Sequence, residues 1–390
     1  MKISLKNICS FQSGGTPSKQ NSDYFNGNIP WITTVALNGR IIDQNSAVDW
    51  ITEKAIQESA AKIVPAGSIM VGTRVGVGKV AINAVPMSTS QDIISLVGID
   101  GSKWNKEYLC KFLQSKESFL KSQSRGATIK GIKIDALAAL EVPGLPLSEQ
   151  EKIVSVLNHT LDIIEQRKAQ LAALDELVKA RFVEMFGDPE SNPNRYPIKM
   201  IGSLLKDIIP GWSANGESRQ KMDDEKAVLK VSAVTQGYFK PEEHKALPAD
   251  MEIKKYVYPH KGDLLFSRAN TRELVGATAI IEEDYPDLLL PDKLWRVLFS
   301  DNLNVYYAKY VLSTDSIRAE FSAQSTGTSG SMFNVSAEKF RKIGIPVPPI
   351  EYQNEFEAFI HQVDKSKTVV QKALDETQLL FDSLMQQYFG

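Results

Sequence analysis

Residues 142–157 read VPGLPLSEQEKIVSVL, and residues 345–360 read IPVPPIEYQNEFEAFI. The two stretches align without a gap, and the alignment continues as far as Gly187 and Gly390. Apolar residues replace apolar residues along much of its length. Seven aligned positions are identical: Pro143/Pro346, Pro146/Pro349, Gln150/Gln353, Leu171/Leu374, Leu177/Leu380, Phe186/Phe389 and Gly187/Gly390. The chain therefore contains an internal duplication, which organises any prediction of its fold.

Each of the two stretches opens a segment with the pattern of a long helix. Residues 148–185 contain no Gly or Pro, and apolar side chains recur at intervals of three, four and seven residues. A helix of about 40 residues extends on the order of 60 Å, and an apolar stripe of that length needs a partner. We predict that the helices pair with each other or dock a partner protein through these residues: Ile153, Leu157, Ile164, Leu171, Val178, Phe356, Ile360, Val363, Leu374 and Leu380.

Shorter elements precede each long helix, in matching places. Strand-like runs bounded by Gly, Pro and Asn are followed by helix-like stretches at 105–122 and 305–322. The strand-like runs are Ile69–Val71, Lys79–Ile82, Ile93–Val97, Val228–Val231, Asp263–Phe266 and Ala277–Ile281. The sequence thus predicts two α+β domains and two helices. The expected boundaries are 1–145 and 188–347 for the domains, and 146–187 and 348–390 for the helices.

The composition is that of an ordinary globular chain with more than one core. The 390 residues include 43% hydrophobic residues, 24% charged residues and only two cysteines. Disorder and a disulfide scaffold are therefore excluded. The start, MKISLKNICSFQSGG, lacks the pattern of a signal peptide, and no apolar run approaches the roughly 20 residues of a membrane span. We expect a protein of the reducing cytoplasm, with no membrane partner.

Candidate catalytic motifs fail on their spacing. Gly72, Gly76, Gly78 and Lys79 suggest a phosphate loop, but the spacing is wrong, and Val80 stands where a Ser or Thr would hold Mg²⁺. The four histidines include no close pair, so neither a metal site nor a catalytic triad is expected. The chain is therefore predicted to bind rather than to catalyse.

The net charge of −2 argues against a nucleic-acid partner, but the charge is unevenly distributed. Residues 1–145 carry 16 basic and 11 acidic side chains, whereas residues 348–390 carry 3 and 7. Within the first domain, eight basic residues lie between Lys103 and Lys133. A solvated helix face explains this run as well as phosphate contact does. Positive charge confined to the globular parts fits domains that touch DNA and helices that touch protein.

With the duplication and its flanking motifs in view, the chain resembles the specificity (S) subunit of type I restriction-modification systems. The resemblance rests on GGTPSKQNSDYFNGNIPWI near the start, GATIKGIKIDALAALEVPGLPLSEQEKI before the first helix and GTSGSMFNVSAEKFRKIGIPVPPIEYQ before the second. It implies two target-recognition domains held apart by an antiparallel, coiled-coil-like helix pair with a pseudo-two-fold axis. Each domain would read one half of a bipartite double-stranded DNA target, and the helices would fix the spacer between the halves.

The resemblance also implies partner subunits. Two methyltransferase subunits would bind S-adenosylmethionine, and restriction or motor subunits would use ATP and Mg²⁺, so that this chain itself needs no cofactor, no metal and no catalytic residue. One departure from the repeat is visible, because Tyr352 stands where the first copy has Glu149. A contact made by Glu149 is then missing on that side.

Candidate DNA contacts lie on Gly-rich turns and loops that occupy matching places in the two domains. Polar side chains read base edges, whereas phosphate contacts supply affinity. The candidates on the turns are Arg74, Lys79, Arg268 and Arg272, and those on the loops 125–130 and 328–331 are Arg125, Lys130, Thr328 and Ser329. For any one of them, a structural ion pair is at least as good an explanation.

Two other functions fit the same sequence. The first is an S-like subunit of a related system, in which nuclease and methyltransferase share one partner chain; the neighbouring genes would separate these cases. The second is an interaction scaffold with no DNA role, favoured by the near-neutral charge. A stand-alone enzyme is the poorest fit, because no acceptable site is present.

Overall fold

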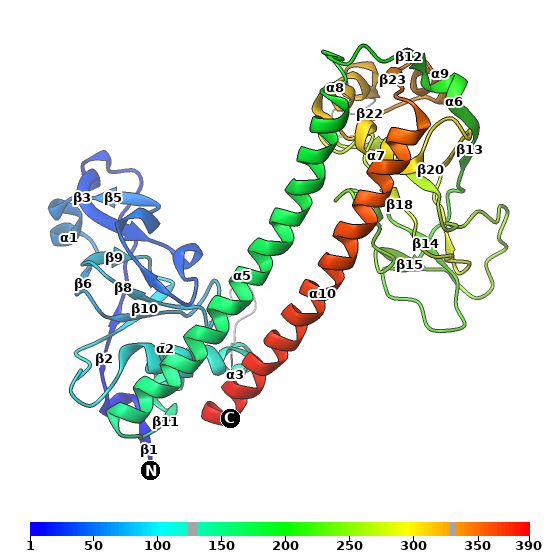
Figure 1. Cartoon of the computed structure of the whole chain (residues 1–390). Coiled ribbons are helices and arrows are strands. Elements are labelled where there is room, and N and C mark those ends of the chain that lie inside the picture. Colours follow the sequence, from blue (N-terminus) through cyan, green and yellow to red (C-terminus); the bar gives the residue numbers. More distant parts are fainter. Residues whose placement is uncertain (124–130, 328–332) are drawn as a thin grey trace. The chain divides into compact units, whose positions relative to one another are not determined.

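Two helices of 40 residues, α5 (Leu147–Phe186) and α10 (Ile350–Phe389), dominate the computed structural model, which describes residues 1–123, 131–327 and 333–390 (Figure 1). Each begins directly after a proline, Pro146 or Pro349, whose carbonyl accepts the first hydrogen bonds of the helix. α5 ends directly before Gly187. The φ angle of this glycine is +75°, a conformation that glycine adopts without steric cost. Both helices begin and end within two residues of the bounds expected from the sequence.

The chain divides into two compact units, each of which holds one half of both long helices. Unit 1 consists of Met1–Lys168 and Gln371–Gly390, and unit 2 consists of Ala169–Val370. In unit 1, the first turns of α5 share a core with the end of α10, whereas in unit 2 the end of α5 shares a core with the first turns of α10. Within each unit, the two helices therefore run antiparallel.

Unit 1 contains two main β-sheets and a small one. The five-stranded sheet has the order β2 (Ser10–Ser13), β10 (Ile93–Val97), β7 (Ile69–Gly72), β8 (Val80–Asn83), β4 (Ile41–Ile42). The four-stranded sheet has the order β5 (Asp49–Ile51), β3 (Phe25–Ile32), β9 (Met87–Thr89), β6 (Ile63–Val64), and β1 (Lys2–Ser4) pairs with β11 (Glu141–Pro143). The helices are α1 (Glu53–Glu58), α2 (Lys106–Ser115), α3 (Glu117–Gln123) and α4 (Ile134–Ala138), with 3-10 turns at Leu5–Asn7, Ser22–Tyr24, Thr34–Ala36 and Gln44–Ser46. Strands β7 and β8 are buried throughout, which explains their continuous apolar runs.

Unit 2 repeats this plan with four strands in its main sheet. Its main sheet has the order β13 (Leu205–Pro210), β20 (Leu294–Phe299), β16 (Leu264–Ser267), β18 (Thr278–Ile280). Two three-stranded sheets follow the orders β15 (His244–Ala246), β14 (Ala227–Leu229), β19 (Leu288–Leu289), and β17 (Ala269–Asn270), β22 (Phe333–Asn334), β21 (Thr326–Gly327). β12 (Ile198–Met200) pairs with β23 (Gly344–Pro346), and the helices are α6 (Ile201–Leu204), α7 (Val305–Leu312), α8 (Asp315–Gln324) and α9 (Ala337–Arg341), with a 3-10 turn at Val231–Ala233.

The duplication extends to the pairing of the strands. β10 lies antiparallel between β2 and β7, and β20 lies antiparallel between β13 and β16. β3 pairs parallel with β9, as β14 does with β19. Ile93 faces Gly72 in the first unit, and Leu294 faces Ser267 in the second. This register makes Thr73 the structural counterpart of Arg268, so that Arg74 and Arg268 do not occupy equivalent positions.

Most predicted elements are present, with differences at their ends. The helix-like stretch 105–122 is two helices, α2 and α3, because the first ends at Lys116. The stretch 305–322 is likewise divided into α7 and α8. The strand expected at 228–231 ends at Leu229, since a 3-10 turn begins at Val231. The α+β class is confirmed in both units. Among the described helices, none is long and apolar enough to cross a membrane.

Candidate nucleic-acid interface

The turn between β7 and β8 carries two of the predicted DNA contacts. Its ends are joined by a hydrogen bond of 2.8 Å from the amide of Gly72 to the carbonyl of Lys79. Gly76 and Gly78 adopt φ angles of +62° and +84°, which side-chain-bearing residues rarely adopt. Arg74 and Lys79 are exposed on this turn, and neither makes an ion pair with any described residue. The glycines thus shape a tight turn with two unpaired cations.

The segment that begins at Gly131 returns to the same turn. The amide of Ile132 donates to the carbonyl of Thr73 at 2.8 Å. A Cβ atom on Gly131 would lie 3.2 Å from Cγ of Arg74, so the absence of a side chain there leaves room for the arginine. Lys133 is exposed immediately beyond this contact and has no ion pair with a described residue. Three cations therefore surround one turn of unit 1.

The equivalent turn of unit 2, between β16 and β18, uses its arginines differently. Arg268 is half-buried; its Nε donates to the carbonyl of Asp292 at 2.8 Å, and its Nη2 lies 3.5 Å from Oδ2 of the same residue. Arg272 is exposed, and its guanidinium carbon lies 5.4 Å from the ring centre of Phe333. Arg268 therefore holds the turn together, whereas Arg272 presents a cation on an aromatic surface.

The four remaining predicted contacts, Arg125, Lys130, Thr328 and Ser329, lie outside the described residues. The residues that flank the second of these loops belong to β21 and β22, which pair with each other and with β17 beside Arg268. The described residues Gly131 and Phe333, which border the two loops, lie beside Arg74 and Arg272 respectively. The role of Arg125, Lys130, Thr328 and Ser329 in DNA contact stays a prediction.

Sequence reasoning missed two residues at these turns. Lys133 was only one member of a basic run, and its place near this turn depends on the return of the segment at Gly131. Phe333 lies far along the chain from Arg272, and only the pairing of β17 with β22 brings them together. No local sequence signal marks either contact.

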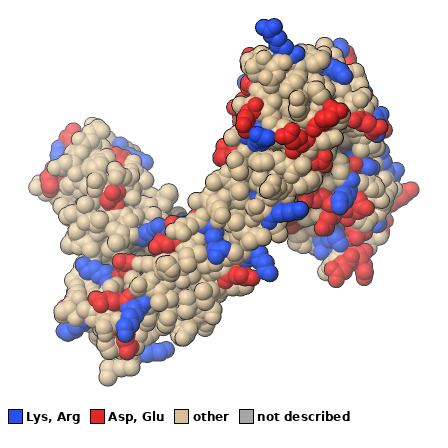
Figure 2. Space-filling view, viewed as in Figure 1, with Lys and Arg blue, Asp and Glu red and all other residues tan. Residues whose placement is uncertain are grey.

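Several cations of unit 2 form ion pairs with neighbouring carboxylates, and acidic and basic side chains are interspersed on the face of unit 2 that Figure 2 shows. The ion pairs with at least one side chain outside the long helices include Lys206–Asp301, Lys226–Asp287, Lys230–Glu243, Arg296–Asp263 and Arg219 with Glu217 and Glu225. Residues 188–347 carry 21 basic and 22 acidic side chains, and part of this balance consists of local ion pairs.

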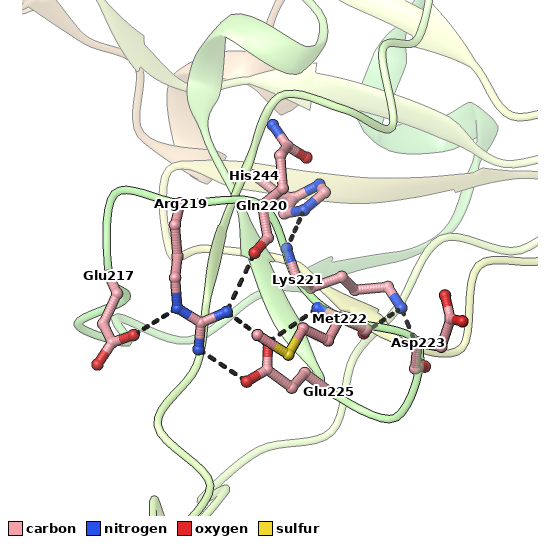
Figure 3. A network of polar contacts seen from close by, with 8 residues as sticks. All are labelled: Glu217, Arg219, Gln220, Lys221, Met222, Asp223, Glu225 and His244. Carbon is pink, nitrogen blue, oxygen red and sulfur yellow. Dashed lines mark hydrogen bonds and ion pairs between the residues drawn. The ribbon is translucent and has the colours of Figure 1, made fainter.

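The largest of these networks centres on Arg219 (Figure 3). Its guanidinium donates to both carboxylate oxygens of Glu225, at 2.6 and 2.7 Å, and to Glu217 at 2.8 Å. These hydrogen bonds hold the pKa of Glu225 down at about 2. Nearby, the Nε2 atom of buried His244 accepts the amide proton of Lys221 at 3.1 Å. The network fixes the 217–225 loop and leaves Arg219 little capacity for phosphate.

The duplicated glutamine of the proline motif has the same structural role in both units. Gln150 is fully buried at the start of α5, accepts the amide proton of Asn105 at 2.8 Å and donates to the carbonyls of Lys103 and Leu145. Gln353 accepts the amide proton of Asn304 at 2.8 Å and donates to the carbonyl of Pro348 at 2.7 Å. Because Asn105 and Asn304 are the N-caps of α2 and α7, each glutamine joins a long helix to its domain.

The duplicated phenylalanines at the ends of the long helices also have matching contacts. In unit 1, the ring of Phe389 lies 5.2 Å from that of Tyr108. In unit 2, the ring of Phe186 lies 4.9 Å from that of Tyr307. The tyrosine hydroxyls donate to the carbonyls of Pro143 and Pro346 respectively, at 3.0 and 2.7 Å. Thus each domain receives the end of the helix that follows the other domain.

The structure buries most of the residues predicted for helix pairing or partner docking. Leu171 is half-buried. Leu380 is 53% exposed and does not belong to either core. At about 100° per residue, Leu380 lies roughly 240° around the helix from buried Leu374, whereas Phe381 and Leu384 face the core of unit 1. The buried predicted residues are Ile153, Leu157, Ile164, Val178, Phe356, Ile360, Val363 and Leu374.

The exposed leucine is nevertheless one of the seven identities of the duplication. Its counterpart Leu177 is also exposed, at 47%. The other identities start the helices, end them or lie on their inner faces, so fold stability accounts for those. The fold gives no reason for an exposed leucine in both copies, and an exposed apolar side chain repeated in this way suggests contact with another molecule.

The described residues offer little to a catalytic mechanism. Burial raises the pKa of the thiols of Cys9 and Cys110 to about 12, so neither is a reactive thiolate. Within the described ranges, no three His, Cys, Asp or Glu side chains gather into a possible metal site. Glu149 and Tyr352, where the two copies of the repeat differ, are both exposed, and the side chain of Glu149 makes no hydrogen bond or ion pair with a described residue.

Comparison with known proteins gives a consistent result. The family model described as "Type I restriction modification DNA specificity domain" matches residues 1–173 and 212–377. The specificity subunit of the type I restriction enzyme MjaIX from Methanocaldococcus jannaschii is 34% identical over 211 residues, which cover 53% of this chain and 48% of that one. The EcoEI specificity subunit from Escherichia coli is 29% identical over 266 residues, which cover 64% and 44%. The chain spans about half the length of the curated relatives it matches.

Two solved structures share the fold. The S subunit of a type I restriction-modification system from M. genitalium has a TM-score of 0.53 at 14% identity, and the match covers 100% of this chain and 96% of that one. A chain from a study of complex assembly and conformational transition of the type I R-M system has a TM-score of 0.61 at 16% identity, with coverage of 100% and 97%. At these identities, the likeness is one of fold.

Proposed function

The chain belongs to the type I restriction modification DNA specificity domain family, and from this premise we propose that it supplies DNA sequence specificity to a type I restriction-modification complex without catalysing a reaction itself. Each unit reads one half of a bipartite double-stranded target. The observation that carries the proposal is the repeated turn, β7–β8 in unit 1 and β16–β18 in unit 2, which has an exposed arginine in both.

The two turns contribute to DNA binding in different ways. Arg74, Lys79 and Lys133 gather charge that phosphates would neutralise, which gives affinity and a strong salt dependence. Arg272, supported by Phe333, offers a single oriented guanidinium, the group that most often recognises guanine in the major groove. Unit 1 thus provides more phosphate contacts than unit 2. Around unit 2, partner subunits supply much of the contact with phosphates.

The long helices have two roles in this proposal, helix pairing and the docking of partner subunits. We assign the inner faces of α5 and α10 to helix pairing, which sets the spacer between the two half-sites. We assign the exposed pair Leu177 and Leu380 to docking of two methyltransferase subunits, because a duplicated residue presents two like surfaces to two like partners.

Cofactors belong to the partner chains in this proposal. The turn at Gly72–Lys79 does not fit a nucleotide phosphate, since Val80 begins a buried strand where a hydroxyl would be needed. S-adenosylmethionine is therefore assigned to the methyltransferase subunits, and ATP with Mg²⁺ to restriction or motor subunits.

Footprinting of the complex reconstituted with methyltransferase subunits tests the bipartite reading. We expect two protected half-sites separated by an unprotected or weakly protected spacer. Protection of one contiguous half-site, or of none, would overturn the proposal. Replacing Leu157 and Ile360 with Asp should break helix pairing and relax the spacer preference, whereas an unchanged preference would remove the ruler role.

Docking is tested by the double variant Leu177→Asp with Leu380→Asp. We expect weaker association with methyltransferase subunits in analytical ultracentrifugation and an unchanged unfolding midpoint, because both side chains are exposed. Val183→Asp is the matched control: Val183 is 57% exposed on α5, and its counterpart in the repeat is Gln386. Equal association of the double variant and the wild type would remove these leucines from the interface.

Two alternatives predict different results. A fused nuclease-methyltransferase partner predicts a single neighbouring gene in place of separate ones. A scaffold without a DNA role is favoured by the paired charges of unit 2 and predicts no DNA complex at any salt concentration. A gel shift in the presence of the partner, repeated as salt rises, separates this scaffold from a specificity subunit, whose affinity must fall steeply.

A further inference from the structure

Unit 1 contains a groove where the turn at 38–41, helix α2 and the long helices meet. Two adjoining hollows of about 330 and 470 Å³ share Gly39, Arg40, Lys111 and Leu161. The smaller hollow has apolar walls from Ile41, Ile82 and Leu161, with polar groups on α2 and α5. Its volume lies within the range of small-molecule sites.

Lys111 is the unusual residue of this groove. It is only 4% exposed, and its ammonium group has no hydrogen bond or ion pair with any described residue. Neighbouring polar groups are engaged elsewhere: Asn158 donates to Glu107 at 2.8 Å, and Arg40 pairs with Glu165. Burial, the largest effect on this group, lowers the pKa of Lys111. A lysine that is nine-tenths buried and has no ion pair with a described residue favours an anion in the hollow that it lines.

The fold does not require the groove, because unit 2 fills the equivalent space. The N-caps Asn105 and Asn304 match across the repeat, which aligns Lys111 with Tyr310. The ring of Tyr310 lies 5.2 Å from that of Phe356 and 6.0 Å from that of Phe182. A simple aromatic filling was therefore available to unit 1, which has a cation and a hollow instead.

The surroundings select the kind of anion. Glu107 and Asp162 lie close enough to act on Lys111 electrostatically, so a dianion would be repelled more than a monoanion. The aliphatic walls favour an apolar body attached to the charged group. We propose that this groove binds a small organic carboxylate, with the ammonium group of Lys111 as its counter-ion. The proposal is independent of DNA recognition.

Thermal unfolding and calorimetric titration of the full chain test this site, with sodium benzoate as the probe and sodium phosphate and sodium chloride at equal ionic strength as comparisons. We expect benzoate to raise the midpoint of unfolding saturably at millimolar concentration and the two comparison salts to have little effect. Lys111→Met should bind benzoate at least about tenfold more weakly, since a charge-assisted hydrogen bond is lost.

Two controls keep the result interpretable. Without ligand, Lys111→Met should unfold at a higher temperature than the wild type, because an unpaired buried charge has been removed. Lys106→Met changes a lysine on the same helix that does not line the groove, and it should bind benzoate like the wild type. The proposal is overturned if benzoate has no effect on the wild type, if phosphate stabilises equally, or if Lys111→Met retains full affinity.

Discussion

The same junction is built in two ways within one chain. Where α7 meets the long helices in unit 2, five aromatic residues pack together with ring centres between 4.9 and 6.0 Å apart. Where α2 meets them in unit 1, Phe389 keeps the contact with Tyr108, but Met385 and Lys111 stand in place of Phe182 and Tyr310. The repeated fold therefore depends on the terminal phenylalanine and its tyrosine, and the remaining positions are free to serve function.

The largest expected effect is the loss of stability when a terminal phenylalanine of a long helix is replaced. Phe186→Ala should lower the free energy of unfolding by about 4–5 kcal/mol, and Phe389→Ala by about 3 kcal/mol. The difference arises because Phe389 borders an open groove, so that its removal leaves less enclosed cavity. Urea unfolding followed by circular dichroism measures both. An equal loss of unfolding free energy in the two variants would show that the groove beside Phe389 does not reduce the cost of removing its ring.

The buried glutamines should instead give similar effects in both units. Gln150→Ala and Gln353→Ala each leave a buried N-cap amide and two carbonyls without their partner, at a cost of about 2–3 kcal/mol. The same unfolding experiment measures this. A cost confined to one variant would mean that the shared motif joins helix to domain on one side only.

The arginines of the two matching turns should separate binding from stability. Arg74→Gln should leave the unfolding midpoint unchanged and reduce the log–log salt dependence of DNA binding by roughly 0.9. Arg268→Gln should lower stability by about 1 kcal/mol, since its hydrogen bond to the carbonyl of Asp292 is lost. Salt titrations of the partner complex on its DNA, together with thermal unfolding, test both. A reversed pattern would exchange the roles assigned to the two turns.

The smallest expected effect concerns pH. Glu225 in unit 2 and Asp100 in unit 1 both have pKa values lowered to about 2, the first mainly by Arg219 and the second mainly by Ser102. Lowered folded-state values mean that the stabilisation is complete above the unfolded-state pKa, about 4.5 for Glu225, and is lost as the pH falls towards 2. In NMR titrations, Arg219→Ala should raise the Glu225 midpoint and leave that of Asp100 unchanged. A shift of both titration midpoints would indicate a general effect of net charge instead of a local hydrogen bond.

The long helices could be predicted from sequence because their signals are local. Prolines fix where α5 and α10 begin, and the absence of Gly and Pro fixes how far they run. The strands of the core were also recognisable as apolar runs between turn residues. The exact correspondence of the two turns was not predictable in the same way, because the pairing of Ile93 with Gly72 is visible only in three dimensions.

The functional surfaces were less predictable because they depend on distant contacts. Arg268 and Arg272 are alike in sequence, and only Asp292 and Phe333 make one structural and the other exposed. Leu380 continued the apolar intervals of α10, yet the helix turns it outwards. The groove is lined by residues of both α2 and the end of α10, which are far apart in the sequence.

The contact between Lys116 and the carbonyl of Phe389 spans 273 residues, and this separation sets an order for folding during synthesis. Unit 2 is continuous in sequence from Ala169 to Val370, so it can close as soon as those residues leave the ribosome. Unit 1 begins before unit 2 but lacks Gln371–Gly390 until all of unit 2 has been made, and its Tyr108 remains until then without the ring that covers it. The unit that is synthesised first is thus the last to complete its folding. Until then, we expect it to be the part of the chain that chaperones bind.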